Sequence, residues 1–146
     1  MDNLLVFVAV ISKDNKPIIL QEFRNNTDIT MHFVVYSSLD IIERKIGEIR
    51  ESGDMTKNFL GYLGPALLGE GDYALYGWLS YTGVKFVTVL REYYETRNDD
   101  KIKQLMQELE KLYISTISNP FHDTKDFTSS KFVGQLQQKA RQILKT

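Results

Sequence analysis

The sequence predicts an α+β domain in which helices cover both faces of an antiparallel sheet. Two pairs of apolar segments are each joined by a short turn, as expected of antiparallel hairpins. Three other stretches carry apolar residues at three- and four-residue steps, which is the helical period: 30–51, 98–118 and about 129–144. Because the predicted strands are apolar on both faces, helices are needed on opposite sides of the sheet.

A hairpin is predicted at the start of the chain. Leu4–Ile11 is a continuous apolar run of the kind found in strands buried on both faces. Lys13–Lys16 is a polar turn, and Pro17 opens a second strand, Ile18–Phe23, at a position where proline is tolerated. The run follows Asp2 and is far shorter than the ~20 residues needed to cross a membrane, so neither a signal peptide nor a spanning helix is expected.

A helix and three strands are predicted in the middle of the chain. The helix 30–51 should end at Gly53, and its predicted core face carries Phe33, Tyr36, Leu39, Ile42, Ile46 and Ile49, broadened by Val35 and Ile41. The strands are 58–63, 73–81 and 84–90, and a Thr82-Gly83 turn joins the last two. We expect the glycine-containing segment Gly64–Gly71 to be an extended loop.

Two helices are predicted to complete the domain. Asn98 or Asp99 can cap the first, and Asn119-Pro120 stops it. Its apolar stripe is Ile102, Leu105, Met106, Leu109, Leu112, Tyr113 and Ile117. The stripe of the second is Phe132, Val133, Leu136, Ala140, Ile143 and Leu144. The predicted element order is therefore ββ-α-βββ-αα, in a single domain spanning residues 1–146.

Composition excludes several classes of function. With 18 basic and 19 acidic residues the net charge is -1, so no general positive field points to a nucleic acid. The chain has no cysteine, which excludes disulfides, thiol catalysis and cysteine-ligated metals. Neither His32 nor His122 has a second histidine at helical spacing, and the glycines of 61–71 lack the Gly-Lys-Ser/Thr ending of a phosphate loop. No catalytic, cofactor-binding or metal-ligating residue is predicted, so the protein is not expected to be an enzyme.

Several ordered blocks resemble one family. They are Ser38-Leu39-Asp40 within 31–46, Phe59-Leu60-Gly61, the segment 72–78, Val84–Val87 and Ser118–His122. In order and spacing these blocks resemble the subunit 2-like proteins of the TRAPP vesicle-tethering complex, which are relatives of sedlin. The resemblance implies a longin-like (SNARE-like) fold, in which a five-stranded antiparallel sheet has one helix on one face and two on the other.

The same resemblance implies a function. It suggests a non-catalytic TRAPP subunit that acts in ER-to-Golgi and Golgi vesicle transport, binds other TRAPP subunits and supports exchange on a Rab-type GTPase only indirectly. Such a protein would be cytoplasmic and would reach endoplasmic reticulum and Golgi membranes through the complex, without a cofactor. The first helix is the implied partner surface, with Tyr36, Leu39, Asp40, Glu43 and Arg44 as its residues. Equally, Asp40 could sit on a solvated helix face or make a local hydrogen bond.

Two other readings of the sequence stay open. One is a longin-type regulatory or adaptor domain that binds a SNARE or a small GTPase outside TRAPP. A SNARE of this type would continue into a heptad helix and a membrane anchor, which favours the TRAPP reading for a chain ending at Thr146. The other is a small enzyme or ligand-binding protein on the same architecture, because a fold does not fix a function.

Overall fold

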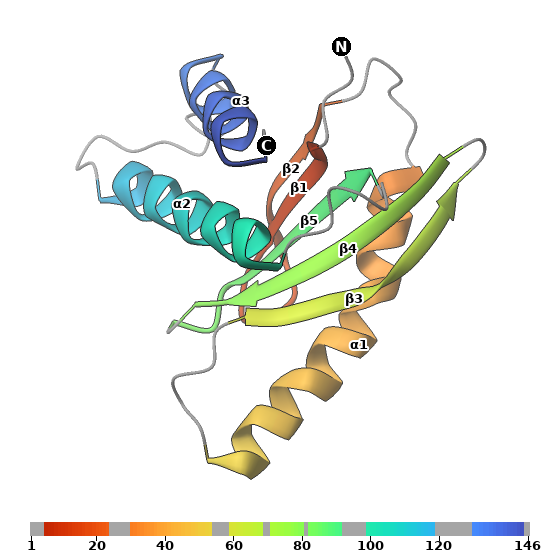
Figure 1. Cartoon of the computed structure of the whole chain (residues 1–146). Helices are drawn as coiled ribbons and strands as arrows, with labels where there is room; N and C mark the ends of the chain where they lie inside the picture. Colours follow the sequence, from red (N-terminus) through yellow and green to blue (C-terminus); the bar gives the residue numbers. More distant parts are fainter. Residues whose placement is uncertain are drawn as a thin grey trace.

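The computed structural model describes residues 5–23, 30–53, 59–68, 71–80, 82–91, 99–118 and 130–144. The elements are β1 (Leu5–Ile11), β2 (Pro17–Glu22), α1 (Thr30–Ser52), β3 (Phe59–Leu68), β4 (Gly71–Leu79), β5 (Lys85–Arg91), α2 (Asp99–Ile117) and α3 (Ser130–Leu144). The strands lie side by side in the order β2-β1-β5-β4-β3, and every neighbouring pair is antiparallel (Figure 1). The predicted α+β class and antiparallel sheet are confirmed.

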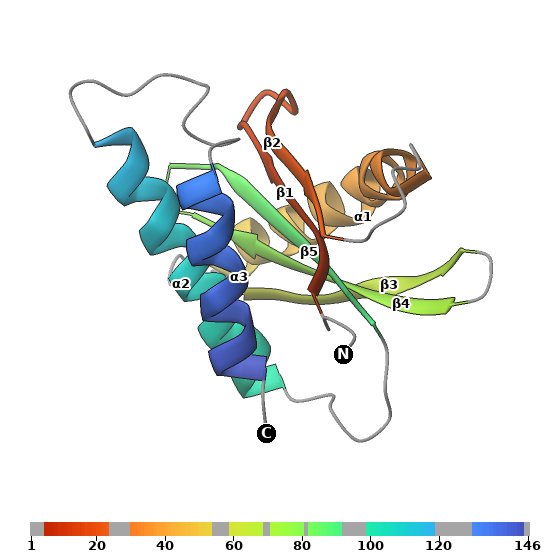
Figure 2. The same ribbon diagram turned by 90° about the horizontal axis from the view of Figure 1, so that it is seen from above.

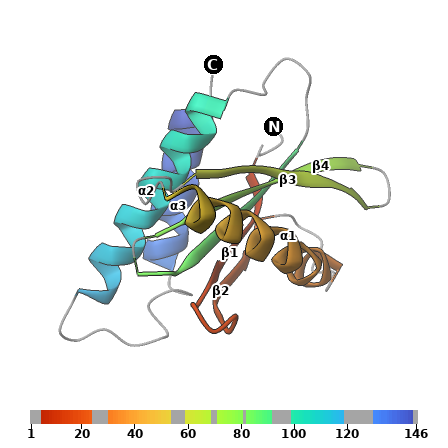
Figure 3. The same cartoon turned by 90° about the horizontal axis from the view of Figure 1, so that it is seen from below.

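Both faces of the sheet are buried. Successive side chains of a strand point to opposite faces. On β1, Val8 and Val10 pack on the side of α2 and α3, whereas Phe7, Ala9 and Ile11 pack on the side of α1. Figures 2 and 3 show the α2–α3 pair on one side of the sheet and α1 on the other. The helices therefore form two separate layers, as the apolar strands require.

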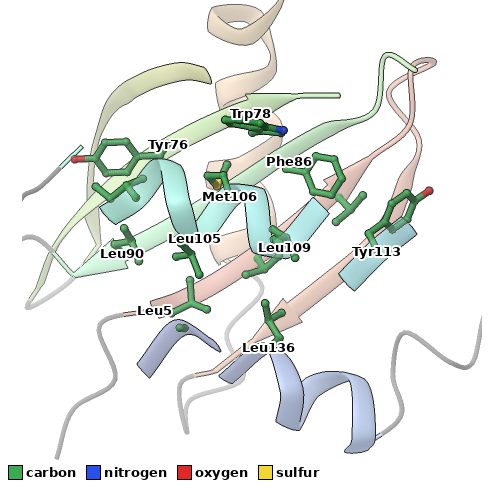
Figure 4. Close-up of a cluster of buried hydrophobic side chains, with 14 of the residues drawn as sticks. Leu5, Tyr76, Trp78, Phe86, Leu90, Leu105, Met106, Leu109, Tyr113 and Leu136 are labelled. Carbon is green, nitrogen blue, oxygen red and sulfur yellow. The ribbon is translucent and has the colours of Figure 1, made fainter. Parts of the chain in front are cut away.

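The larger core lies between the sheet and the α2–α3 pair. Leu105, Met106 and Leu109 of α2 and Leu136 of α3 belong to one buried cluster with the aromatic side chains of β4 and β5 (Figure 4). The rings of Phe86 and Tyr113 meet edge to face, with centroids 5.6 Å apart and an angle of 82° between their planes. This cluster is Leu5, Val8, Val10, Ile19, Ala74, Tyr76, Trp78, Phe86, Leu90, Ile102, Leu105, Met106, Leu109, Tyr113, Phe132, Leu136 and Ala140.

Polar contacts also fix α2. The indole Nε1 of Trp78, on β4, donates a hydrogen bond to Oε2 of Glu110. On the other side of the helix, Nζ of Lys139 on α3 lies 3.6 Å from Oε2 of Glu108. That second pair is largely solvated, so it contributes under about 1 kcal/mol. Apolar burial therefore does most to hold this layer.

Two helix positions differ from prediction. Tyr36 and Ile117 were expected on the core faces of their helices, but they are 41% and 43% exposed. In α1, Val35 takes the inward position, and the next residue is turned about 100° away from it. In α2, the buried stripe ends at Tyr113, and Ile117 lies one turn beyond it at the end of the helix.

The prediction that Gly64–Gly71 forms a loop is wrong for 64–68 and for Gly71, and residues 69–70 lie outside the described residues. β3 continues to Leu68, and Pro65 pairs with Ala74, Ala66 with Tyr73 and Leu68 with Gly71. Proline and glycine fit here because β3 is an edge strand with one neighbour, and register shifts within it absorb the irregularity.

Glycines have clear roles at two points. Gly53 adopts φ +74° and ends α1, which confirms the predicted helix stop. Gly77 of β4 lies under β3, where an added Cβ would be 3.2 Å from Cβ of Leu60 and 3.1 Å from Cδ1 of Leu63. A larger residue at 77 would therefore require the side chains of Leu60 and Leu63 to shift by a few tenths of an ångström.

Truncating the α2 stripe tests this packing. Leu109→Ala should lower the free energy of unfolding by about 2–5 kcal/mol, because Leu109 is 1% exposed and its removal leaves a cavity. Ile114→Ala, on the same helix at 47% exposure, is the matched control. It should change the free energy of unfolding by no more than about 0.5 kcal/mol. Urea denaturation measures both, and equal losses would contradict the orientation of α2.

Candidate partner-binding surface

The outer face of α1 gathers most of the predicted site residues. Val35, Ile42 and Ile46 are buried against the sheet. On the opposite side of the helix Tyr36, Asp40, Glu43 and Arg44 are exposed, at spacings of four, seven and eight residues. Leu39 is half-buried and packs against the core under α1. Four of the five predicted residues therefore share one solvent-facing surface, and Leu39 lies at its margin.

Three of these side chains have no partner within the part of the chain that the structure describes. Tyr36, Asp40 and Arg44 make no hydrogen bond or ion pair there. Tyrosine and arginine are enriched in protein interfaces, where the ring supplies contact area and the guanidinium pairs with carboxylates. Such a face can bind another protein, but it offers no group activated for chemistry.

Glu43 differs from its neighbours because its carboxylate pairs with a buried residue of the sheet. Its Oε1 accepts a hydrogen bond from Nζ of Lys85, the first residue of β5. The same Nζ donates to Oδ1 of Asn15 in the turn between β1 and β2. Lys85 is 3% exposed, whereas half of the Glu43 side chain faces solvent. One buried ammonium thus joins α1, β5 and the β1–β2 turn.

The Lys85 contact governs the charge of Glu43. The hydrogen bond from Lys85 is the main cause that lowers the pKa of the Glu43 carboxyl below 4.5, and partial burial opposes it. The positive charge of Lys85, the Asn15 side chain and the charge of Arg50 add to the lowering of this pKa. Glu43 is therefore ionised at neutral pH.

Other polar contacts place α1 on the sheet. Nζ of Lys45 donates to the backbone oxygen of Leu60 on β3 at 3.1 Å. The hydroxyl of buried Ser38 donates to the backbone oxygen of Val35 at 2.6 Å, so it needs no partner on the sheet. The helix is thus tied to β3 by Lys45 and to β5 by Glu43.

Sequence reasoning missed Lys85. A signal was present, because Lys85 precedes Val87 and Val89 at the strand period of two and so shares their inward face. Such a lysine requires a partner, since charged side chains are almost never fully buried unless they are paired. The sequence alone does not name that partner.

Among the described residues no three histidine or acidic side chains gather as a metal site. Nor is any helix in those residues long and apolar enough to cross a membrane. His122 and the side chain of His32 lie outside the part of the chain that the structure describes.

The titration of Glu43 is a direct test of the Lys85 contact. The pKa of Glu43 should lie below 4.5 in the native protein and rise toward that value in Lys85→Met, as NMR of the side-chain carboxyl would report. Because the folded pKa is lowered, the stability that the pair contributes is present above about pH 4.5 and is lost as pH falls through the folded pKa. An unchanged pKa in Lys85→Met would contradict the pairing. Glu108, which pairs elsewhere, is the internal control.

The chain is similar in sequence to several known proteins. The family described as Sedlin matches residues 10–145. A "Trafficking protein particle complex subunit 2-like protein" of Dictyostelium discoideum is 36% identical over 132 residues, covering 87% of this chain and 89% of that protein. The protein of that name from Bos taurus is 30% identical over 129 residues, covering 88% and 90% respectively. "Trafficking protein particle complex subunit 20" of Saccharomyces cerevisiae is 25% identical over 170 aligned positions, covering 94% and 97%.

The family match begins near the end of β1 and includes β2 to β5 and all three helices, and therefore the α1 surface. On this basis the protein belongs to the sedlin family.

Proposed function

We propose that this protein is a subunit of the trafficking protein particle (TRAPP) complex and acts in vesicle tethering by binding other subunits. The observation that carries this proposal is the extent of the similarity. The relatives named as subunits of that complex are matched over 89% and 90% of their own length. This extent of similarity supports a role in assembly without catalysis.

The fold in this proposal is longin-like, with a five-stranded sheet, one helix on one face and two on the other. Two features support this assignment. The order β2-β1-β5-β4-β3 places the first and last strands in sequence, β1 and β5, next to each other in the centre. The helices also divide one against two between the two apolar clusters.

The partner surface in this proposal is the outer face of α1, formed by Tyr36, Asp40, Glu43 and Arg44, with Leu39 at its margin. α2 and α3 pack against each other as well as against the sheet (Figure 2). Among the described elements α1 is the one helix on its face of the sheet, and its outer side is exposed (Figure 3). A protein partner would gain an exposed tyrosine ring and two opposite charges that have no partner within the described residues.

Partners and location follow from the same role. The direct partners are other TRAPP subunits, and a Rab-type GTPase is reached only through them. The protein associates with endoplasmic reticulum and Golgi membranes as a peripheral component of the complex, and no cofactor takes part. The balanced charge of -1 supports this arrangement, because it gives the chain no general attraction of its own to anionic lipids.

Purification from the source cell tests the assembly role. A tagged full-length chain should recover other TRAPP subunits at near-stoichiometric levels. Recovery of a SNARE or a free small GTPase in their place would support a longin-type adaptor and contradict the proposal. Recovery of no trafficking protein would also overturn it.

Substitutions on α1 test the proposed surface. Asp40→Tyr and Tyr36→Ala should each weaken subunit capture by about tenfold, because they change the unpartnered centre of the face. Both side chains are exposed, so the free energy of unfolding should change by no more than about 0.5 kcal/mol.

Gln107→Ala, which removes an exposed side chain of α2 on the other side of the sheet, is the control and should bind normally. Full capture of the other subunits by both Asp40→Tyr and Tyr36→Ala would show that the outer face of α1 is not the partner surface. Outright unfolding of Asp40→Tyr would show that Asp40 is structural.

A further inference from the structure

Stability does not account for the burial of Lys85. Lys85 is 3% exposed. Its neighbours on the same face of β5, Val87 and Val89, are wholly buried and apolar. Removing an ammonium from water carries a desolvation penalty that an ion pair often fails to recover, and an apolar residue of similar volume is commonly as good or better. The burial of Lys85 is better explained by the positions in which it holds the groups that it pairs with.

The turn that receives Lys85 is itself well fixed. The backbone N–H of Ser12 donates to the oxygen of Lys16 at 2.8 Å, and that of Asn15 donates to the oxygen of Ser12 at 2.9 Å. Asn15 adopts φ 65°, a conformation that asparagine tolerates better than most residues. The side chain of Lys13 packs over Gly83 in the neighbouring hairpin turn. The Oδ1 of Asn15 is therefore a defined point at the end of the sheet.

Glu43 and Lys45 hold α1 from two sides. Two residues correspond to about 200° of rotation around a helix, so these side chains leave it in nearly opposite directions. Glu43 reaches Lys85 on β5, and Lys45 reaches the backbone of Leu60 on β3. A rotation of α1 about its axis that shortens one contact would lengthen the other. The apolar face between them packs without such directionality.

We propose that Lys85 is a positioning residue, whose buried ammonium clamps Glu43 and Asn15 and so sets the rotation of α1 on the sheet. Glu43 is three residues from Asp40 and adjacent to Arg44. The clamp therefore fixes the direction in which the outer face of α1 presents its side chains to a partner. This inference rests on the proposed function of that face.

Lys85→Met tests the clamp, because methionine keeps a long unbranched side chain and removes the charge. In the full-length protein, affinity for the TRAPP subunits recovered by purification should fall by about threefold to thirtyfold. The urea transition should stay cooperative, with a midpoint close to that of the wild type. Amide hydrogen exchange should quicken in residues 12–16 and 36–44 while α2 and α3 stay unchanged. Lys103→Met, which removes an exposed lysine of α2, is the control and should bind normally.

Two surface variants keep the test valid if Lys85→Met fails to fold. Glu43→Ala and Asn15→Gly each remove one acceptor, and glycine keeps the left-handed turn conformation. Each should weaken capture, and combining Glu43→Ala with Lys85→Met should add little to the stronger single effect. Full affinity in Glu43→Ala and Asn15→Gly would overturn the clamp, as would additive losses in the double variant.

The outcomes separate this inference from the proposed function. If Tyr36→Ala and Asp40→Tyr weaken capture but a well-folded Lys85→Met does not, the clamp is wrong and the α1 surface stands. If none of these variants weakens capture, both fall, because α1 then carries no surface to be positioned. Weakened capture in all of them, with quicker exchange confined to α1 and the β1–β2 turn, is the expected result.

Discussion

The sheet is buried on both faces, and the rest of the molecule follows from that constraint. All seven residues of β1 are buried, so neither side of the strand can be left to water. α1 covers one face and the α2–α3 pair covers the other. Among the described elements this unequal division leaves α1 without a helix packed beside it, and its outer side carries the exposed ring of Tyr36. The proposed binding surface thus arises from how the core is covered.

Most elements could be predicted because their signals are local. Helical period, strand period and turn residues lie within a few positions of one another, and they correctly indicated α1, α2, α3 and the hairpins β1–β2 and β4–β5. The segment Gly64–Gly71 could not be predicted in this way. Its glycines and Pro65 favour a loop locally, but pairing with β4 determines its structure. The inward face of α1 was likewise too wide in prediction, because Val35 and Tyr36 are both apolar and only packing decides between them.

The candidate surface could also be predicted from the sequence only in part. An exposed stripe on α1 that includes Asp40 and Arg44 can be placed from helical spacing and from the family resemblance. The internal contact of Glu43 cannot, because Lys85 is 42 residues away in the chain and Asn15 is 70 residues from Lys85. Their meeting depends on β1 lying beside β5 and on α1 crossing that pair. The spacing of Lys85, Val87 and Val89 at every second residue indicates only that Lys85 points inward.

A binding subunit needs a surface held in one orientation more than it needs additional stability. Apolar packing under α1 favours burial but is satisfied by a range of small rotations, since the hydrophobic effect has no direction. A charge-assisted hydrogen bond has a preferred length and angle, so it distinguishes between those rotations. Placing Lys85 beneath the helix exchanges some apolar burial for such a contact. Because Glu43 is half exposed, the contact sits at the boundary between core and surface, where a fixed sheet can determine the direction of side chains that a partner would touch.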